Sequence, residues 1–383
     1  MTRLTFITQI IFDHGASQQL AKVLAQHGIQ RPLLCTDRGL VNLGMVEDLT
    51  KVVGNDAALT IFDRTPENPT QAAVEEALAL YREADCDGVV AFGGGSSMDL
   101  AKAVAVSATH QGDLQEFTTE AGGMQKIDAI APLIAIPTTS GTGSEVSSGA
   151  VIIMNNGEKL LLVSPNIVPR TAICDPSLTL GLPPTLTAAT GMDAMTHCIE
   201  ALLSPMVNPP AEAVACDGIE RGIREGNLLR AFADGSDEDA RWHMMMAATE
   251  GAMAFTKGLG AVHSMSHACG ADQSLRLHHG TLNAVILPTI LEFNRDHVGS
   301  KYGRLNAAMG INENLDPADH IRGLNQALGL PANLGEMGIE SEAVPALARH
   351  AAKDICTFTN PRPCSVEQYE ALFAVALEGG KVA

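Results

Sequence analysis

The sequence contains few aromatic and few basic residues, and both shortages limit what the protein can be. Aromatic residues make up 4% of the 383 residues, so the core must be built mainly from alanine, methionine and leucine, which favour closely packed helices. Lysine and arginine number 25 against 44 acidic residues, which gives a formal net charge of −19. A negative field of this size repels phosphate backbones and anionic lipids, which argues against a nucleic-acid or membrane partner.

Other features are absent altogether. The eight cysteines are scattered through apolar segments without a CxxC pair, which is typical of reduced, buried thiols. There is no uninterrupted apolar run of about 18 residues, as a membrane-spanning helix would need. The opening "MTRLTFITQIIFDHG" has only a short apolar run and no small-residue cleavage site, unlike a signal peptide. We therefore predict a cytoplasmic protein, long enough for two domains.

The first half of the chain alternates between two patterns. Short, nearly all-apolar runs such as "PLLCT" (32–36) and "ALTIF" (58–62) are followed by segments with helical spacing, such as residues 69–84. This alternation predicts a parallel β-sheet covered by helices on both faces. The opening "LTFITQIIF" (4–12) predicts a hairpin or an edge strand.

The pattern changes after "AICDPSLTLGLPP" (172–184), where proline and glycine interrupt both periodicities. Strand-like runs nearly vanish beyond residue 185, and long segments rich in alanine, methionine and leucine take their place. We predict an α/β domain over residues 1–182 and an all-helical domain over residues 183–383.

Two polar loops each follow a predicted strand. In "VVAFGGGSSMDLAK" three glycines end the strand, and Ser96 or Ser97 is predicted to cap the next helix, whose free N–H groups attract phosphate. An ordinary strand-to-helix turn is the alternative. The second loop, "PTTSGTGSEV" (137–146), adds hydroxyl groups after another strand. Because ligands of open α/β sheets bind at the carboxyl ends of the strands, the two loops together predict a phosphate-containing ligand.

The usual GxGxxG of dinucleotide-binding folds is absent. The first strand that precedes a helix ends instead in "CTDRGL", where Asp37 can bind the two ribose hydroxyls of NAD and repel the extra phosphate of NADP. A helix cap is the alternative role for Asp37.

Histidines and one aspartate form a candidate metal site. Asp193 and His197 lie four residues apart in a segment with helical spacing, so they share one helix face and can chelate a cation or form a simple polar pair. His263 and His267 repeat this spacing, and His279 begins another helical segment. One carboxylate together with three of these four imidazoles suits a divalent metal such as Fe²⁺ or Zn²⁺.

Nearly the whole chain resembles the iron-containing (group III) metal-dependent alcohol dehydrogenases. The motifs that carry the resemblance occur in the family's order, and their wording is closest to the 4-hydroxybutyrate dehydrogenase branch: "TDRGL", "ENPT", "GGGSSMDLAKA", "PTTSGTGSEV", "AICDPSLT", "GMDAMTHCIE", "GLGAVHSMSHACGA" and "HHGTLNAVILP". The resemblance implies a Rossmann-like NAD domain and a helical metal domain, as in dehydroquinate synthase, with the active cleft between them. It also implies a homodimer or larger homo-oligomer.

The resemblance also assigns residues. The metal ligands would be Asp193, His197, His263 and His279, and His267 would be a non-ligand histidine beside the nicotinamide, acting as a proton relay. The cofactor-binding residues would be Asp37, Asn68, Gly94, Gly95, Ser96, Asp99, Thr138, Thr139, Ser144 and Lys159. The loop before His279 is longer than in many members, which makes His278 an alternative ligand and otherwise a neighbour of the cleft.

The implied activity is NAD-dependent interconversion of a short-chain primary alcohol and its aldehyde, with Fe²⁺ or Zn²⁺ polarising the alcohol oxygen. The branch suggests an ω-hydroxy acid and its semialdehyde, such as 4-hydroxybutyrate and succinic semialdehyde. Arg276 is then a candidate for binding the carboxylate, or else an exposed loop residue. The alternatives are a reductase of other alcohols, diols or anionic aldehydes, a zinc-dependent glycerol dehydrogenase, a lyase of the dehydroquinate synthase type, and a catalytically silent NAD-binding protein.

Overall fold

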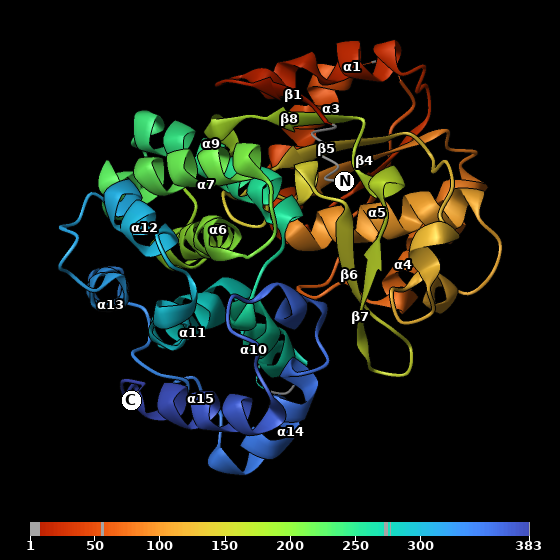
Figure 1. The fold of residues 1–383 in the computed structure, drawn as a ribbon. Helices are drawn as coiled ribbons and strands as arrows, with labels where there is room; N and C mark the ends of the chain where they lie inside the picture. Colours follow the sequence, from red (N-terminus) through yellow and green to blue (C-terminus); the bar gives the residue numbers. More distant parts are fainter. Residues whose placement is uncertain (1–7, 55–56, 272–274, 276, 383) are drawn as a thin grey trace. The chain divides into compact units, whose positions relative to one another are not determined.

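The computed structural model describes residues 8–54, 57–271, 275 and 277–382, which divide into two compact units. Residues 8–139 and 143–179 form the N-terminal unit, and residues 140–142 together with those from 180 onward form the C-terminal unit. Figure 1 shows strands in the first unit and helices throughout the second.

The N-terminal unit is built on a sheet of six parallel strands in the order β1-β8-β5-β4-β2-β3. The strands are β1 (Gln9–Phe12), β2 (Pro32–Cys35), β3 (Thr60–Phe62), β4 (Gly88–Gly93), β5 (Leu133–Pro137) and β8 (Thr171–Cys174). Every residue of β2, β4, β5 and β8 is buried, as expected for parallel strands that helices cover on both faces. The predicted parallel sheet is confirmed.

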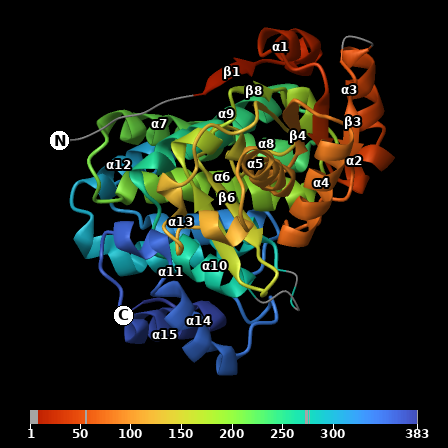
Figure 2. The same ribbon diagram turned by 90° about the vertical axis from the view of Figure 1, so that its right-hand side faces the viewer.

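The described residues of this unit form five α-helices: α1 (Leu20–Gln26), α2 (Arg38–Asn42), α3 (Met45–Val53), α4 (Gln71–Glu83) and α5 (Gly95–Thr109). Successive side chains of a strand point to opposite faces, and β4 shows this directly. Val89 and Ala91 join the apolar cluster that contains α4 and α5, whereas Val90 and Phe92 join the cluster that contains α1 and α3. Figure 2 shows α2, α3 and α4 near β3, at one edge of the sheet.

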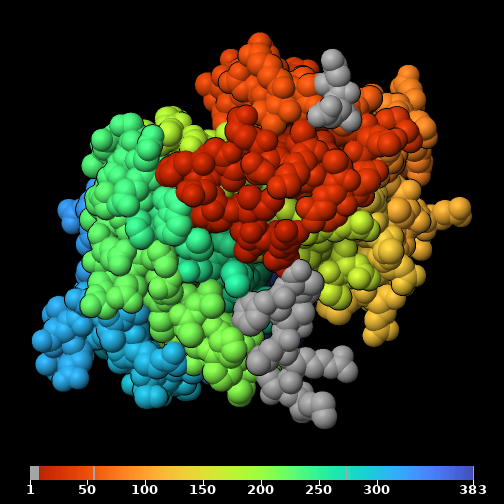
Figure 3. Space-filling view, turned by 90° about the horizontal axis from the view of Figure 1, so that it is seen from above, coloured from red at the N-terminus to blue at the C-terminus, as the bar shows by residue number. Residues whose placement is uncertain are grey.

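Two segments of this unit differ in how well they could be predicted. Strand β1 is an edge strand parallel to β8, one of the two predicted possibilities, and the segment from β1 to α1 (red in Figure 3) lies at the surface of the unit. The antiparallel hairpin of β6 (Gly149–Ile153) and β7 (Lys159–Val163) was not predicted. It carries Lys159.

The described residues of the C-terminal unit form helices and no strand. The α-helices are α6 (Pro184–Leu203), α7 (Pro209–Ile219), α8 (Asn227–Ala233), α9 (Glu238–Ala254), α10 (Ala261–Gly270), α11 (His279–Asn294), α12 (Lys301–Met309), α13 (Pro317–Ala327), α14 (Val344–Ala351) and α15 (Val366–Glu378). Helix α6 is buried on all sides from Thr187 to Leu203, packed against α7, α9 and α11. A helix enclosed in this way can carry polar side chains only where they find partners. No helix of the described residues is long and apolar enough to cross a membrane.

Candidate active site

Three helices of the C-terminal unit bring the four predicted metal ligands together. Helix α6 supplies Asp193 and His197, both buried, with His197 Nε2 3.8 Å from Asp193 Oδ1. The ring of His263, from α10, lies against that of His197, with the centroids 4.8 Å apart. His279, the first residue of α11, places its Nε2 3.7 Å from Asp193 Oδ1. Ligand atoms of Asp193, His197 and His263 all lie within 4.8 Å of one another.

The polar groups at this point fit a cation. The side-chain nitrogen of Asn283 lies 2.7 Å from Asp193 Oδ1, 3.2 Å from His263 Nε2 and 3.1 Å from His279 Nε2. An amide group carries only two hydrogens, so it cannot donate to three acceptors at once. The carboxylate and the ring nitrogens therefore outnumber the donor among them, and a divalent metal that accepts their lone pairs would restore the balance.

The protonation state of His197 agrees with this fit. Burial lowers the pKa of His197 to about 4, although the charge of Asp193 opposes the shift. The ring is therefore neutral near pH 7, which is the form of imidazole that ligates a metal.

His267 lies one turn after His263 on α10, and its ring stacks on that of His279 with the centroids 5.4 Å apart. Its Nδ1 lies 2.9 Å from Asp354 Oδ2. Burial of Asp354 opposes ionisation, but the charge of His267 and hydrogen bonds from His267 and Cys356 outweigh it and hold the pKa of Asp354 below its usual range. An ionised carboxylate only accepts hydrogen bonds, so Nδ1 carries the proton and Nε2 is left to exchange one.

The segment before α11 contains two further predicted residues. The side chain of His278, at the N-cap position of α11, is exposed, whereas His279 lies in the cluster. This arrangement favours His279 as the ligand. Arg276 lies outside the described residues.

A glycine beside His279 lets two helices approach closely. A Cβ atom at Gly280 would lie 2.2 Å from the carbonyl oxygen of Ala189 and 3.1 Å from Cβ of Asp193. Only glycine allows α11 to meet α6 at this distance, which brings His279 within reach of Asp193.

The first glycine loop of the N-terminal unit corrects one prediction. Helix α5 begins at Gly95 with Gly94 as its N-cap and no side-chain cap, so neither Ser96 nor Ser97 caps it. Both serines lie inside the first turn, where the Ser96 hydroxyl donates to the backbone carbonyl of Glu67. Gly93 has a φ of +150°, and a Cβ there would lie 2.6 Å from Ser97 Oγ. The first N–H groups of α5 are thus free of side-chain caps, as a phosphate-binding helix start requires.

The second loop is anchored to α5 by a buried lysine. Asp99 accepts hydrogen bonds from Ser144 Oγ at 2.7 Å and from the Val151 N–H at 2.9 Å. Lys102 is fully buried, and its Nζ lies 2.7–3.0 Å from four oxygens, to which its three hydrogens can donate: Ser144 Oγ, Ser147 Oγ and the carbonyl oxygens of Ser147 and Gly149. Burial lowers the pKa of Lys102 to about 8, so it stays mostly charged at pH 7.

The remaining predicted cofactor residues lie in the same unit. Asp37 is the N-cap of α2 and accepts from the Leu40 N–H at 3.1 Å, so the capping role is realised, and ribose binding stays a prediction. Lys159 Nζ lies 3.4 Å from Asn68 Oδ1, which brings two predicted cofactor residues together. Thr138 and Thr139 directly follow β5, and a Cβ at Gly94 would lie 3.5 Å from the side chain of Thr139. The two loops are therefore neighbours.

Two family models match this chain, one over each half. The model "Iron-containing alcohol dehydrogenase" matches residues 8–176, and "Fe-containing alcohol dehydrogenase family, C-terminal" matches residues 187–377. The chain belongs to the iron-containing alcohol dehydrogenase family. The predicted family and fold class are confirmed, and this dehydrogenase is an oxidoreductase.

Relatives of this iron-containing alcohol dehydrogenase match it over nearly its full length. A 4-hydroxybutyrate dehydrogenase from Cupriavidus necator is 48% identical over 97% of this chain and 99% of its own. A solved structure of a 1,3-propanediol oxidoreductase is 33% identical, with a TM-score of 0.93, over 98% of this chain and all of its own. A sulfoacetaldehyde reductase from Bifidobacterium kashiwanohense, solved in complex with NAD⁺, is 25% identical over 98% of both chains, with a TM-score of 0.88.

Four polar residues beside these sites were not predicted: Glu200, Asn283, Asp354 and Lys102. Helical spacing could have indicated three of them, because Glu200 follows His197 by three residues, Asn283 follows His279 by four and Lys102 follows Asp99 by three. Asp354 lies 87 residues from its partner His267, and no spacing rule points to it.

Proposed function

We propose that this iron-containing alcohol dehydrogenase uses NAD and a divalent metal to interconvert 4-hydroxybutyrate and succinic semialdehyde. The convergence of Asp193, His197, His263 and His279 supports the metal-dependent chemistry. The identity of 48% with the 4-hydroxybutyrate dehydrogenase of Cupriavidus necator supports the substrate. We propose Fe²⁺ as the metal, from the family, with Zn²⁺ as the alternative that the same ligands accept.

When bound, the metal supplies a Lewis acid for the alcohol oxygen, and the nicotinamide supplies the hydride acceptor. The protein's own residues do the rest. Asp193 and the three imidazoles hold the metal. Asp354 holds Nδ1–H of His267, so that Nε2 of His267 takes up the proton that the alcohol loses and returns it in the reverse reaction.

For the cofactor, we propose that the uncapped start of α5 at Gly94, Gly95 and Ser96 binds the pyrophosphate. Asp37 then binds the adenosine ribose and excludes NADP. Asn68, Thr138, Thr139, Ser144 and Lys159 complete the cofactor site, with Asp99 and Lys102 holding Ser144 in place. The complex of the related sulfoacetaldehyde reductase with NAD⁺ supports this choice of cofactor.

The experiment combines metal analysis with a substrate panel. The purified protein should contain about one Fe²⁺ or Zn²⁺ per chain and should oxidise NADH with succinic semialdehyde at least about tenfold more efficiently, in kcat/KM, than with butanal, because recognition of a charged carboxylate contributes at least about 1.4 kcal/mol. In the opposite direction, more efficient reduction of NAD⁺ with glycerol than with 4-hydroxybutyrate would favour a glycerol dehydrogenase instead. Preference for sulfoacetaldehyde would place the enzyme with the related sulfoacetaldehyde reductase.

Two substitutions test the proposed roles of side chains. Arg276→Ala should raise KM for succinic semialdehyde far more than for butanal, and equal effects on both would refute carboxylate binding by Arg276.

His267→Ala should lower kcat while the metal content stays intact, and an unchanged pH–rate profile would refute the proton relay.

We also propose a cytoplasmic homo-oligomer that acts on small molecules and not on nucleic acid or membranes. The net charge of −19 supports the absence of polyanionic partners. Light scattering on the purified protein would test the oligomeric state.

A further inference from the structure

Glu200 is a buried acidic residue on α6 that the proposed chemistry does not use. Its side chain is 6% exposed, and it lies one turn after the proposed ligand His197. Both of its oxygens face α10. Oε1 accepts a hydrogen bond from the Val262 N–H at 2.8 Å, and Oε2 lies 2.6 Å from Nδ1 of His263.

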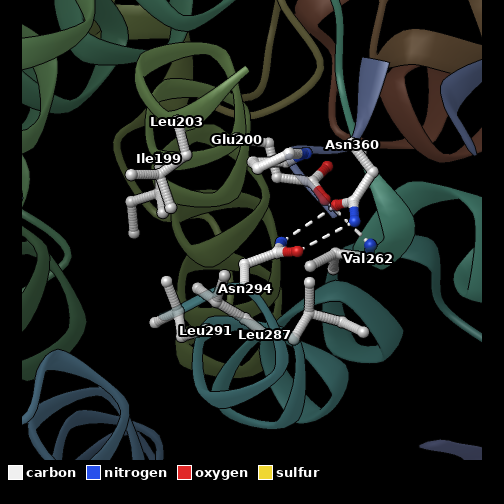
Figure 4. Close-up of a pocket in the computed structure, with 11 residues that line it drawn as sticks. Ile199, Glu200, Leu203, Val262, Leu287, Leu291, Asn294 and Asn360 are labelled. Atoms are coloured by element: carbon white, nitrogen blue, oxygen red, sulfur yellow. Dashed lines mark hydrogen bonds between the residues drawn. The ribbon is translucent and has the colours of Figure 1, made fainter. Parts of the chain in front are cut away.

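The start of α10 is shaped around this contact. The Ala261 N–H donates to Asn360 Oδ1 at 3.1 Å, so Glu200 and Asn360 together cap the first N–H groups of the helix. A Cβ atom at Gly260 would lie 2.8 Å from both acceptor oxygens, so glycine leaves room for them. Figure 4 shows Glu200, Val262 and Asn360 along the wall of a small cavity, where Asn360 also exchanges two hydrogen bonds with Asn294.

The contact decides which nitrogen of His263 is available to a metal. A carboxylate only accepts hydrogen bonds, so the group facing Glu200 Oε2 must be Nδ1–H. The other nitrogen, Nε2, then carries a lone pair, and it lies 3.2 Å from the amide nitrogen of Asn283, which also contacts Asp193 and His279. A carboxylate on the far nitrogen of a ligating histidine fixes the ring's tautomer and strengthens its binding.

We infer that Glu200 is a positioning residue for the metal centre: it holds His263 in the Nδ1–H tautomer and fixes the start of α10, so that Nε2 is presented to the metal. This inference rests on the proposed metal site. Helix α6 then contributes three side chains to the site: Asp193 and His197 as ligands, and Glu200 as the hydrogen-bond partner of His263 on α10.

The test is the affinity for Zn²⁺, measured by competition with a chelator and without NAD or substrate. Glu200→Gln keeps the size of the side chain but offers one acceptor oxygen to two donors, so Zn²⁺ binding should weaken by about 10–100-fold. Glu292→Gln is the matched control. The side chain of Glu292 is also only 4% exposed and also accepts from a side chain, Arg322, and from a backbone N–H, that of Val382, but among the described residues it is paired with no proposed ligand. Glu292→Gln should leave the affinity for Zn²⁺ within about threefold of the wild type. A loss of about 10–100-fold is expected only when the substituted residue is a hydrogen-bond partner of a metal ligand.

A double-mutant cycle separates positioning from general stabilisation. If Glu200 acts through His263, then His263→Ala and the double variant with Glu200→Gln should bind Zn²⁺ equally, within about threefold. Additive losses would mean that Glu200 acts independently of the ring and would overturn the inference.

The unmodified apoprotein provides a measurement that does not depend on folding of a variant. ¹⁵N NMR of its histidine rings, with His263 assigned through His263→Ala, should show the hydrogen on Nδ1. A hydrogen on Nε2 would overturn the inference, as would Glu200→Gln binding Zn²⁺ like Glu292→Gln. The metal site itself is tested separately, because it fails if the wild type binds no Zn²⁺ or if His263→Ala binds it equally well.

Discussion

The two units differ in how they stabilise the charge of an acidic side chain at their sites. In the N-terminal unit, Asp99 has a fully buried lysine one turn later on the same helix, and Lys102 counters the rise in the pKa of Asp99 that burial causes. In the C-terminal unit, Asp193 is surrounded by imidazoles and one amide. Asp99 thus has its own lysine nearby, whereas the described partners of Asp193 include no lysine or arginine, which supports the proposed metal site.

Asp193→Asn is expected to have the largest effect. The variant should lose its metal and about 10³-fold in kcat, because Lewis-acid stabilisation of the transition state is worth several kcal/mol. Its melting temperature without metal should equal or exceed that of the wild-type apoprotein, since an unbalanced buried charge is removed. Metal analysis, kinetics and thermal unfolding in EDTA check both points. A metal-free variant that is clearly less stable than the wild-type apoprotein would mean that Asp193 is already compensated.

Lys102→Met tests the role of the buried lysine beside Asp99 in the N-terminal unit. Removal of the cation leaves Asp99 without its nearby positive charge and several oxygens without their donor, so the free energy of unfolding should fall by about 3–5 kcal/mol. KM for NAD should rise while the metal content stays unchanged. Denaturant unfolding measures the effect. Lys51→Met is the control, because its ion pairs with Glu47 and Asp48 are exposed and contribute little.

Asp37 differs from both Asp99 and Asp193, because its carboxylate is stabilised by the start of a helix instead of a cation. Asp37→Ser removes the charge but can still cap α2, so stability should be kept while kcat/KM with NADPH rises about tenfold relative to NADH. Asp37→Ala should show the same change in cofactor preference but lose about 1 kcal/mol of stability. If the ratio of the two cofactors is unchanged in both variants, Asp37 is a cap alone.

Glu250 is stabilised in a further way, by a proton. Burial, together with the nearby Asp217, raises the pKa of Glu250 to about 9. A folded-state pKa above the ordinary value of 4.5 gives stability that is full below about pH 4.5 and is lost as the pH rises toward 9. Glu250→Gln mimics the protonated form, so its melting temperature should fall less than that of the wild type between pH 6 and pH 9. Parallel melting curves would show that Glu250 is ionised throughout.

The sequence predicts the parts of this molecule that depend on local periodicity. Apolar runs predicted β2 and β4, and the i,i+4 spacing predicted that Asp193 and His197 lie on the same face of a helix. Partners that are joined only by folding could not be predicted, such as Asp354 for His267. The serine caps were wrong because the N-cap is Gly94, two residues before Ser96 and three before Ser97, which leaves the serine hydroxyls inside the first turn. The hairpin of β6 and β7 was missed because its buried and half-buried positions do not alternate strictly.

The absence of a side chain at Gly280 determines how closely the two helices that carry His279 and Asp193 can approach. The side chain of any larger residue there would collide with the backbone of α6. The two helices would have to move apart, which would separate the imidazole of His279 from the carboxylate of Asp193. Saturation mutagenesis of this position should therefore yield inactive proteins even though residue 280 has no functional group of its own.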